Sequence, residues 1–302
     1  MVTGIHFILS YMCNSECDHC FVFSSPRAKG TFTPSQLEAV FNEIDKIGSA
    51  DAVYFEGGEP FLFYPLMLKG ISLARNRSLS VGIVTNAYWA TSEEMAELYL
   101  DPLVNLGIDD LSLSDDDFHA EGTDALVYNA LAVAQKLGIP TDTICIEKPT
   151  VMSKEINKQE KGEPIIGGDV IFRGRAVDNL IENLPRRPWT EFTGCPFEDL
   201  ANPKRLHVDA YGNVHLCQGL LMGNMWQTPL SKLIYNYKGK DHPIAGPIIR
   251  GGLVELVKKY NFEPKEDYVD ACHLCYMCRR ALLESFPLYL GPKCVYGFEE
   301  KD

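Results

Sequence analysis

The chain has no apolar run that approaches 18 residues, so nothing in it predicts a membrane-spanning helix. Its N-terminus lacks the basic region and the long apolar core of a secretory signal peptide. Positive charge is scarce, with 28 Lys and Arg against 41 Asp and Glu. Because nucleic-acid affinity depends on basic residues that neutralise phosphates, this balance argues against nucleic acid as a partner. These absences predict a cytoplasmic protein that binds neither membrane nor nucleic acid.

The composition is otherwise that of a globular protein, apart from its cysteines. Of the 302 residues, 46% are hydrophobic and 23% are charged, which allows a large buried core. In a reducing compartment, ten cysteines are more often metal ligands than disulfide partners. Nine of them lie toward the two ends of the chain, and Cys145 stands apart.

Short apolar strands alternate with helical segments through the first 176 residues. The expected strands are residues 5–9, 52–55, 81–86, 110–114, 141–147 and 169–173. The expected helices are residues 34–47, 64–77, a segment ending near 106, and 124–137. Capping boxes mark two helix starts, Thr33 with Gln36 and Thr91 with Glu94. Residues 150–165 show little periodicity, which predicts a loop or a short helix.

This alternation requires right-handed crossovers and a parallel sheet. It predicts an α/β fold, a partial (β/α)6 barrel of the TIM type, over residues 1–188. The rhythm stops there, and we expect residues 189–302 to form a small cysteine-rich α+β domain. Within it, residues 205–208 and 214–216 flank a turn at 209–213, which predicts a β-hairpin.

Three cysteines follow the first strand with the spacing C-x3-C-x2-C, namely Cys13, Cys17 and Cys20. With neither a fourth cysteine nor a histidine at zinc-finger spacing, they can hold three irons of a cubane cluster and leave one iron open. An open coordination position distinguishes a reactive metal site from a structural one. A structural zinc or ferredoxin-like site is the alternative.

The second strand is followed by the tetrapeptide Gly57-Gly58-Glu59-Pro60. With the cysteine spacing, it resembles the radical S-adenosylmethionine (radical SAM) enzymes over residues 5–176. The resemblance implies a [4Fe–4S] cluster whose open iron chelates the methionine moiety of SAM. An electron from the reduced cluster then cleaves the sulfonium and releases a 5′-deoxyadenosyl radical.

The resemblance implies roles for further residues. The Gly57 to Pro60 stretch contacts the methionine amino group, through a strand-end carbonyl or the Glu59 carboxylate. Its alternative role is a plain strand-to-helix turn. Asn86 and Ser114 stand at strand ends, where polar side chains reach the ribose or carboxylate of SAM. Phe21 is expected to shield the adenine or simply to pack.

Other candidates serve the substrate. Arg173 resembles a strand-end arginine that pairs with a carboxylate of SAM or substrate, or it forms an interdomain salt bridge. Asp117 and His119, in an acidic loop, are expected to orient substrate or move protons, unless the loop is simply solvated. Cys145 is expected to donate hydrogen to a substrate radical if it points into the barrel, and otherwise to be a small core residue.

The C-terminal cysteines resemble a SPASM or shorter twitch extension, which carries auxiliary [4Fe–4S] clusters. They are Cys195, Cys217, Cys272, Cys275, Cys278 and Cys294. The full SPASM pattern has more cysteines and another spacing in its middle group. Six thiols suit one four-cysteine cluster with two left over, or two clusters of which one lacks a cysteine ligand. Zinc is the alternative metal.

Together these features predict a radical SAM oxidoreductase or maturase that abstracts hydrogen from a C–H bond. In similar proteins the substrate is most often a ribosomally made peptide that is crosslinked, oxidised or epimerised. The alternatives are a small-molecule substrate, such as an amino acid, sugar or cofactor precursor, and an iron–sulfur electron-transfer protein. A flavodoxin- or ferredoxin-type donor would supply electrons. Because only twelve residues precede Cys13, we expect leader-peptide binding to need a separate protein.

Overall fold

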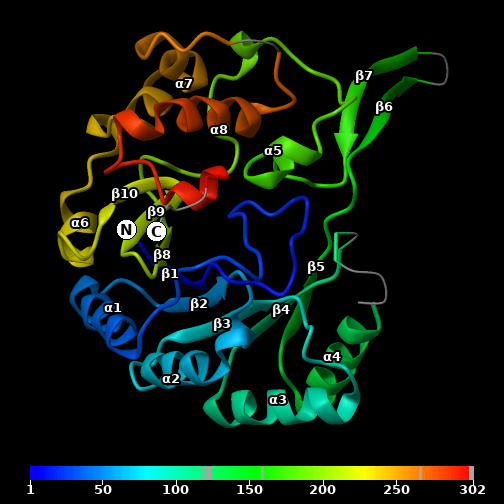
Figure 1. Cartoon of the computed structure of the whole chain (residues 1–302), viewed down its shortest axis with the longest axis vertical. Helices are drawn as coiled ribbons and strands as arrows, with labels where there is room; N and C mark the ends of the chain where they lie inside the picture. Colours follow the sequence, from blue (N-terminus) through cyan, green and yellow to red (C-terminus); the bar gives the residue numbers. More distant parts are fainter. Residues whose placement is uncertain (117, 120–123, 158–159, 265–266, 299–302) are drawn as a thin grey trace.

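The computed structural model describes residues 1–116, 118–119, 124–157, 160–264 and 267–298. Its centre is an eight-stranded sheet in the order β10-β9-β8-β1-β2-β3-β4-β5 (Figure 1). The strands are β1 (Gly4–Ser10), β2 (Ala52–Gly57), β3 (Ser80–Thr85), β4 (Asp110–Ser114), β5 (Thr141–Ile144), β8 (Arg205–Asp209), β9 (Asn213–Cys217) and β10 (Leu220–Asn224). Strands β1 to β5 pair in parallel, which confirms the α/β class and the partial TIM-type architecture.

Helices connect these parallel strands and pack together on one side of the sheet (Figure 1). They are α1 (Pro34–Ile47), α2 (Tyr64–Arg75), α3 (Glu93–Leu106) and α4 (Asp124–Leu137). The core between α1 and the sheet is aromatic: Phe7 stacks on Phe41 and on Phe55, each at 5.2 Å between ring centroids. Among the described residues, every helix is too short or too polar to cross a bilayer.

Helix starts follow local capping chemistry. At α1 the predicted box is confirmed: the Thr33 hydroxyl accepts from the Gln36 N–H, and the Gln36 side chain accepts from the Thr33 N–H. At α3 the prediction was one residue early. Ser92, not Thr91, is the N-cap and accepts from the Met95 N–H. Thr91 and Ser92 both carry a hydroxyl group that can cap a helix, and the sequence spacing did not show which of them is the N-cap.

Two predicted segments fold differently. Residues 169–173 form no strand, because the chain turns at Gly168 and Asp169, both with positive φ. Residues 150–165 belong to an antiparallel hairpin, β6 (Thr150–Asn157) and β7 (Glu160–Gly167), which projects from the body (Figure 1). Residues of high β propensity at its base, such as Val151 opposite Ile166, favour strand pairing. The sequence did not predict these strands because apolar and polar residues do not alternate along them.

The cysteine-rich part shares the sheet with the first half of the chain. Strand β8 pairs in parallel with β1, and β8 with β9 forms the predicted antiparallel hairpin. The remaining helices, α5 (Arg175–Asn179), α6 (Leu230–Asn236), α7 (Ala245–Lys259) and α8 (Ala271–Leu282), follow β7 in the chain. The sheet therefore runs across the boundary that we placed at residue 188, and that boundary stays a prediction.

Candidate active site and a second cysteine pocket

One cavity lies at the carboxyl ends of β2, β3 and β4, and the three N-terminal cysteines line it. The predicted site residues in its lining are Cys13, Cys17, Cys20, Phe21, Gly57, Gly58, Asn86, Ser114 and His119. Sequence reasoning missed Glu56 and Thr85, which also line it, and named the acidic loop but not Asp116 as the carboxylate that lines the cavity. The carboxyl ends of parallel strands are where barrel enzymes place their chemistry.

Two of the cysteine sulfurs in this cavity accept hydrogen bonds from backbone N–H groups, as metal-bound thiolates do. The Ser15 N–H donates to Cys13 Sγ over 3.4 Å, and the Ser24 N–H donates to Cys20 Sγ over 3.3 Å. Burial raises the pKa of the Cys13 and Cys17 thiols to about 12, so a bound cation is needed to hold them as thiolates. Thiolates that accept N–H bonds are the ligands of iron–sulfur clusters, and these residues fit such a group.

The two glycines join the end of β2 to the cysteine loop. The Gly58 N–H donates to the Ser10 carbonyl over 2.7 Å. A Cβ on Gly58 would lie 2.0 Å from the Met12 carbonyl oxygen, and Gly57 has a φ of 128°. Only glycine permits this approach. We expected the glycines to admit a ligand; they also admit the backbone that carries the cysteines.

Glu59 and Pro60 are buried and follow the two glycines that line the cavity. The Glu59 carboxylate accepts from the Phe61 N–H, the Asn86 N–H and the Thr85 hydroxyl over 2.8–3.0 Å. Burial raises its pKa to about 7 despite these donors. Pro60 begins the 3-10 helix η1 (Pro60–Phe63). Glu59 therefore ties the end of β2 to the end of β3.

An acidic residue and two histidines stand at the side of the cavity after β4. Asp116 lies 3.1 Å from His119 Nδ1 and 3.6 Å from His19 Nε2. Burial opposes ionisation of Asp116, but His119 and His19 lower its pKa below the usual value. Asp117 lies outside the described residues. The acidic run was visible in the sequence, but which carboxylate faces the cavity was not.

The segment after β7 clamps the cysteine loop. The Arg175 N–H donates to the Cys20 carbonyl, and its guanidinium donates to the carbonyls of Cys17 and Ser24. Arg173 stacks over the Phe21 ring at 5.0 Å and donates to Cys217 Sγ over 2.9 Å. We expected Arg173 to pair with a carboxylate of SAM or substrate, or to form an interdomain salt bridge; in the structure it bonds a sulfur of the cysteine-rich part. From the sequence we did not name Arg175 as a site residue. The one signal for it in the sequence was its position directly after Gly174.

A second, apolar pocket collects four of the six C-terminal cysteines. They are Cys195, Cys217, Cys272 and Cys275. Cys217 ends β9, while Cys272 and Cys275 lie three residues apart near the start of α8, so both face the same side. Burial raises the pKa of the Cys275 thiol to about 11. The positive end of the α8 dipole and the bound metal's charge would both favour thiolates here.

Two buried arginines also line this pocket, Arg173 and Arg279. Arg279 is 2% exposed, and its guanidinium donates to the Gln218 carbonyl over 3.0 Å. In the part of the chain that the structure describes, the Nε atoms of both arginines lack hydrogen-bond partners. Buried cations with spare donors require a nearby anion. Four thiolates around a metal cluster would supply it.

The other predicted cysteines lie elsewhere. Cys278 is buried in the main hydrophobic core, and Cys294, in η5 (Lys293–Tyr296), packs beside Ile8 and Tyr11. Neither lines the four-cysteine pocket. Cys145 follows β5, is exposed, and lies outside the lining of both pockets. It is therefore not the core residue that we offered as its alternative role.

Comparison with known proteins agrees with this site. Residues 7–149 match the model of the radical SAM superfamily. YydG of Bacillus subtilis (strain 168), whose name assigns it to peptide biosynthesis, is 22% identical over 289 residues, which are 94% of this chain and 81% of YydG.

Two solved structures share the fold. BtrN in complex with AdoMet and 2-DOIA matches with a TM-score of 0.52 and 18% identity, over 78% of this chain and 83% of BtrN. Native anSMEcpe with bound AdoMet matches with a TM-score of 0.51 and 14% identity, over 95% of this chain and 97% of that one. The family model spans both motifs that line the cavity, at residues 13–20 and 57–60. Residues 7–149 of this chain therefore form a radical SAM domain, and enzymes of that superfamily use SAM and a [4Fe–4S] cluster.

Proposed function

We propose that this enzyme modifies a ribosomally made peptide and carries one auxiliary [4Fe–4S] cluster. The similarity to YydG carries the peptide assignment, because it covers 94% of this chain and so extends beyond the radical SAM domain into the cysteine-rich part. Crosslinking, oxidation and epimerisation of the peptide all begin with removal of a hydrogen atom from a C–H bond.

In the first site, Cys13, Cys17 and Cys20 would hold the SAM-binding cluster. When bound, SAM and that cluster supply a 5′-deoxyadenosyl radical. The chain's own residues would position the cofactor: the carbonyls at the end of β2 would accept from its ammonium group, while Asn86 and Ser114, which line the cavity, would offer polar groups to its ribose or carboxylate. Phe21, fixed beneath the Arg173 guanidinium, offers an aromatic face to the adenine.

Asp116 and the two histidines beside it are the residues that would transfer protons. Asp116 accepts from the Phe118 N–H over 3.0 Å and faces both His119 and His19, so its carboxylate is held in one orientation. His119 also lines the cavity and can take or give a proton at a substrate atom there. Cys145, exposed beyond β5, would serve as a hydrogen donor only to a peptide that reaches that end of the sheet.

In the second site, Cys195, Cys217, Cys272 and Cys275 would hold the auxiliary cluster and accept an electron from the substrate radical. Two buried arginines support this because they offset the charge of a tetrathiolate cluster. Arg173 touches both sites, since it stacks on Phe21 in the first cavity and bonds Cys217 in the second. This contact gives a short protein path between the sites.

The proposed reaction also requires other proteins. A flavodoxin- or ferredoxin-type protein would supply the electron that starts each turnover, and a separate protein would bind the leader of the peptide. A radical SAM enzyme of small molecules is the second candidate function, and the fold shared with BtrN, described in complex with 2-DOIA, favours it.

Mass spectrometry after anaerobic incubation tests the assignment. Candidate peptides encoded beside the gene are incubated with reduced enzyme and SAM in H2O and in D2O. Crosslinking or oxidation to a double bond removes two hydrogen atoms, whereas epimerisation leaves the mass unchanged in H2O and adds one deuterium in D2O. A Cys17→Ala variant is the control and should leave every peptide unchanged. SAM cleavage that proceeds while all peptides remain unmodified, but a small molecule changes, would move the assignment to the second candidate.

A further inference from the structure

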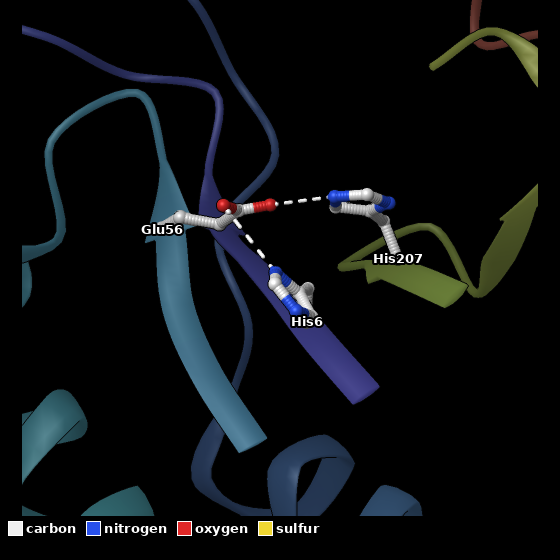
Figure 2. Close-up of side chains that lie close together, drawn as sticks. All are labelled: His6, Glu56 and His207. Atoms are coloured by element: carbon white, nitrogen blue, oxygen red, sulfur yellow. Dashed lines mark ion pairs between the residues drawn. The ribbon is translucent and has the colours of Figure 1, made fainter. Parts of the chain in front are cut away.

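A third group of metal-ligand residues lies on the strands of the sheet and contains no cysteine, although one member, Glu56, also lines the first cavity. His6 on β1, Glu56 on β2 and His207 on β8 meet there, with both imidazoles turned toward the carboxylate (Figure 2). Glu56 Oε1 lies 2.8 Å from His207 Nε2, and Glu56 Oε2 lies 3.5 Å from His6 Nδ1. One ligand atom from each residue lies within 4.8 Å of the others.

Strand register explains the meeting. In the parallel pairing, His6 stands opposite His207 on one side and opposite Tyr54 on the other. Glu56 follows Tyr54 by two residues, so it projects from the same face of β2. The His6 ring stacks on Tyr54 at 4.6 Å between centroids. Because β1 and β2 are central strands, the three side chains stand on a rigid base.

Hydrogen bonding leaves part of this group unsatisfied. Within the described residues, His6 Nδ1 is buried and makes no hydrogen bond, because its 3.5 Å contact with Glu56 is too poor. The buried Gln218 Oε1 also lacks a partner there, while the amide nitrogen of Gln218 lies 3.3 Å from His207 Nε2. The two ends of an amide are assigned by their surroundings, and a rotated Gln218 would turn its oxygen toward the histidine.

We propose that His6, Glu56 and His207 bind one divalent transition-metal ion, with zinc as the ion to test. Two histidines and one glutamate are the protein ligands of many catalytic zinc sites, and the similar two-histidine, one-carboxylate set holds non-haem iron. Three protein ligands leave a coordination position open. The side-chain amide of Gln218, which lies 3.3 Å from His207 Nε2, is one candidate to fill it. Because Glu56 also lines the first cavity, an oxygen or nitrogen atom of a molecule bound there is the other ligand for that position.

Zinc content and zinc X-ray absorption test this site without any reading of radical chemistry. Cluster-loaded enzyme is equilibrated with zinc, freed of loosely bound metal, and analysed by mass spectrometry for zinc and iron. We expect about one zinc per chain beyond the iron, with a shell of nitrogen and oxygen at about 2.0–2.2 Å. A sulfur shell at about 2.3 Å would place the zinc on cysteines and overturn the proposal. Zinc at background level would also overturn it and leave a hydrogen-bonded triad.

Matched variants locate the ion. His6→Phe removes one ligand and keeps an aromatic ring for stacking on Tyr54, while Glu56→Gln keeps shape and removes the charge. Both should lose most of the zinc and retain wild-type iron, and the retained iron shows that the chain has folded. Tyr54→Phe alters the same layer of the sheet without removing a ligand and should keep the zinc. Zinc retained at the wild-type level in both His6→Phe and Glu56→Gln would refute the assignment.

Discussion

The two cysteine sites are built in contrasting ways. The first has three cysteines on a loop, and its cavity contains backbone and polar groups such as Asn86, Ser114 and Asp116. The second has four cysteines on β9, α8 and a neighbouring loop, in a pocket that is otherwise apolar except for two arginines. The first site has room and varied polar partners for a ligand besides its metal, whereas the second is smaller and its charged side chains are the two arginines.

This difference indicates that the number of cysteine ligands decides whether a cluster binds a reactant or transfers electrons. A cluster with three protein ligands keeps one iron open and can bind a reactant, as an open coordination position does at a catalytic zinc. A cluster with four thiolates has no open iron and is suited to accept or pass on an electron. The buried Arg173 and Arg279 stabilise negative charge at the second site, where an added electron would raise it further.

The largest effect should come from removing the first site. Joint replacement of Cys13, Cys17 and Cys20 by alanine should abolish release of 5′-deoxyadenosine, because no open iron remains to bind SAM. Iron should fall from about eight atoms per chain to about four, the content of one [4Fe–4S] cluster. Cys145→Ala, which changes an exposed cysteine outside both pockets, is the control and should keep all the iron. Release of 5′-deoxyadenosine by the triple variant would contradict the assignment.

The second site should separate SAM cleavage from substrate turnover. Cys272→Ala should also halve the iron, yet reduced protein should still release 5′-deoxyadenosine, because the first site is intact. Peptide oxidation should fall strongly, since the electron from the substrate has no acceptor. Cys278→Ala, six residues further along α8 and in the main core, should keep the full iron content. If iron is lost in the Cys278 variant instead, the ligand set is wrong.

Glu59 offers a smaller effect that is confined to the first site. Its carboxylate accepts three hydrogen bonds, and Glu59→Gln replaces one acceptor oxygen by an NH2 group that faces donors. An unsatisfied buried group costs about 1–3 kcal/mol of unfolding free energy. A lower urea midpoint and faster loss of iron to a chelator should report it. The exposed Glu94→Gln is the control, and equal behaviour of the two variants would remove Glu59 from this role.

The sequence predicted the first site better than the second because its signals are local. Cysteine spacing, a strand, and a glycine pair at the next strand end lie within residues 5–60, and the parallel sheet brings them together. The partition of six C-terminal thiols depends on contacts between β9, α8 and a loop, which no local pattern encodes. The same holds for His207, which meets His6 only because β8 returns to pair with β1.

Errors in the predicted elements had similar causes. Residues 169–173 are apolar enough for a strand, but positive φ at Gly168 and Asp169 and the docking of Gly174 on the Cys20 carbonyl direct them to the cysteine loop. Arg173 ends this segment and bonds Cys217 in the cysteine-rich part. A tertiary contact, rather than intrinsic propensity, decided the path of the chain here.

Arg173 supplies the finest test of the contrast, because it contacts both sites. Arg173→Met keeps an unbranched side chain over Phe21 and removes the charge and the bond to Cys217 Sγ. A lost charge-assisted bond of about 1.4 kcal/mol corresponds to roughly 60 mV for a one-electron couple. We expect the auxiliary cluster to become harder to reduce by about that amount in an anaerobic redox titration followed by electron paramagnetic resonance, while the first cluster shifts less. Arg280→Met, which removes an arginine paired with Asp178 on the outer side of α8, is the control. An unchanged auxiliary potential, or an equal shift in the control, would show that Arg173 serves only to pack the two sites together.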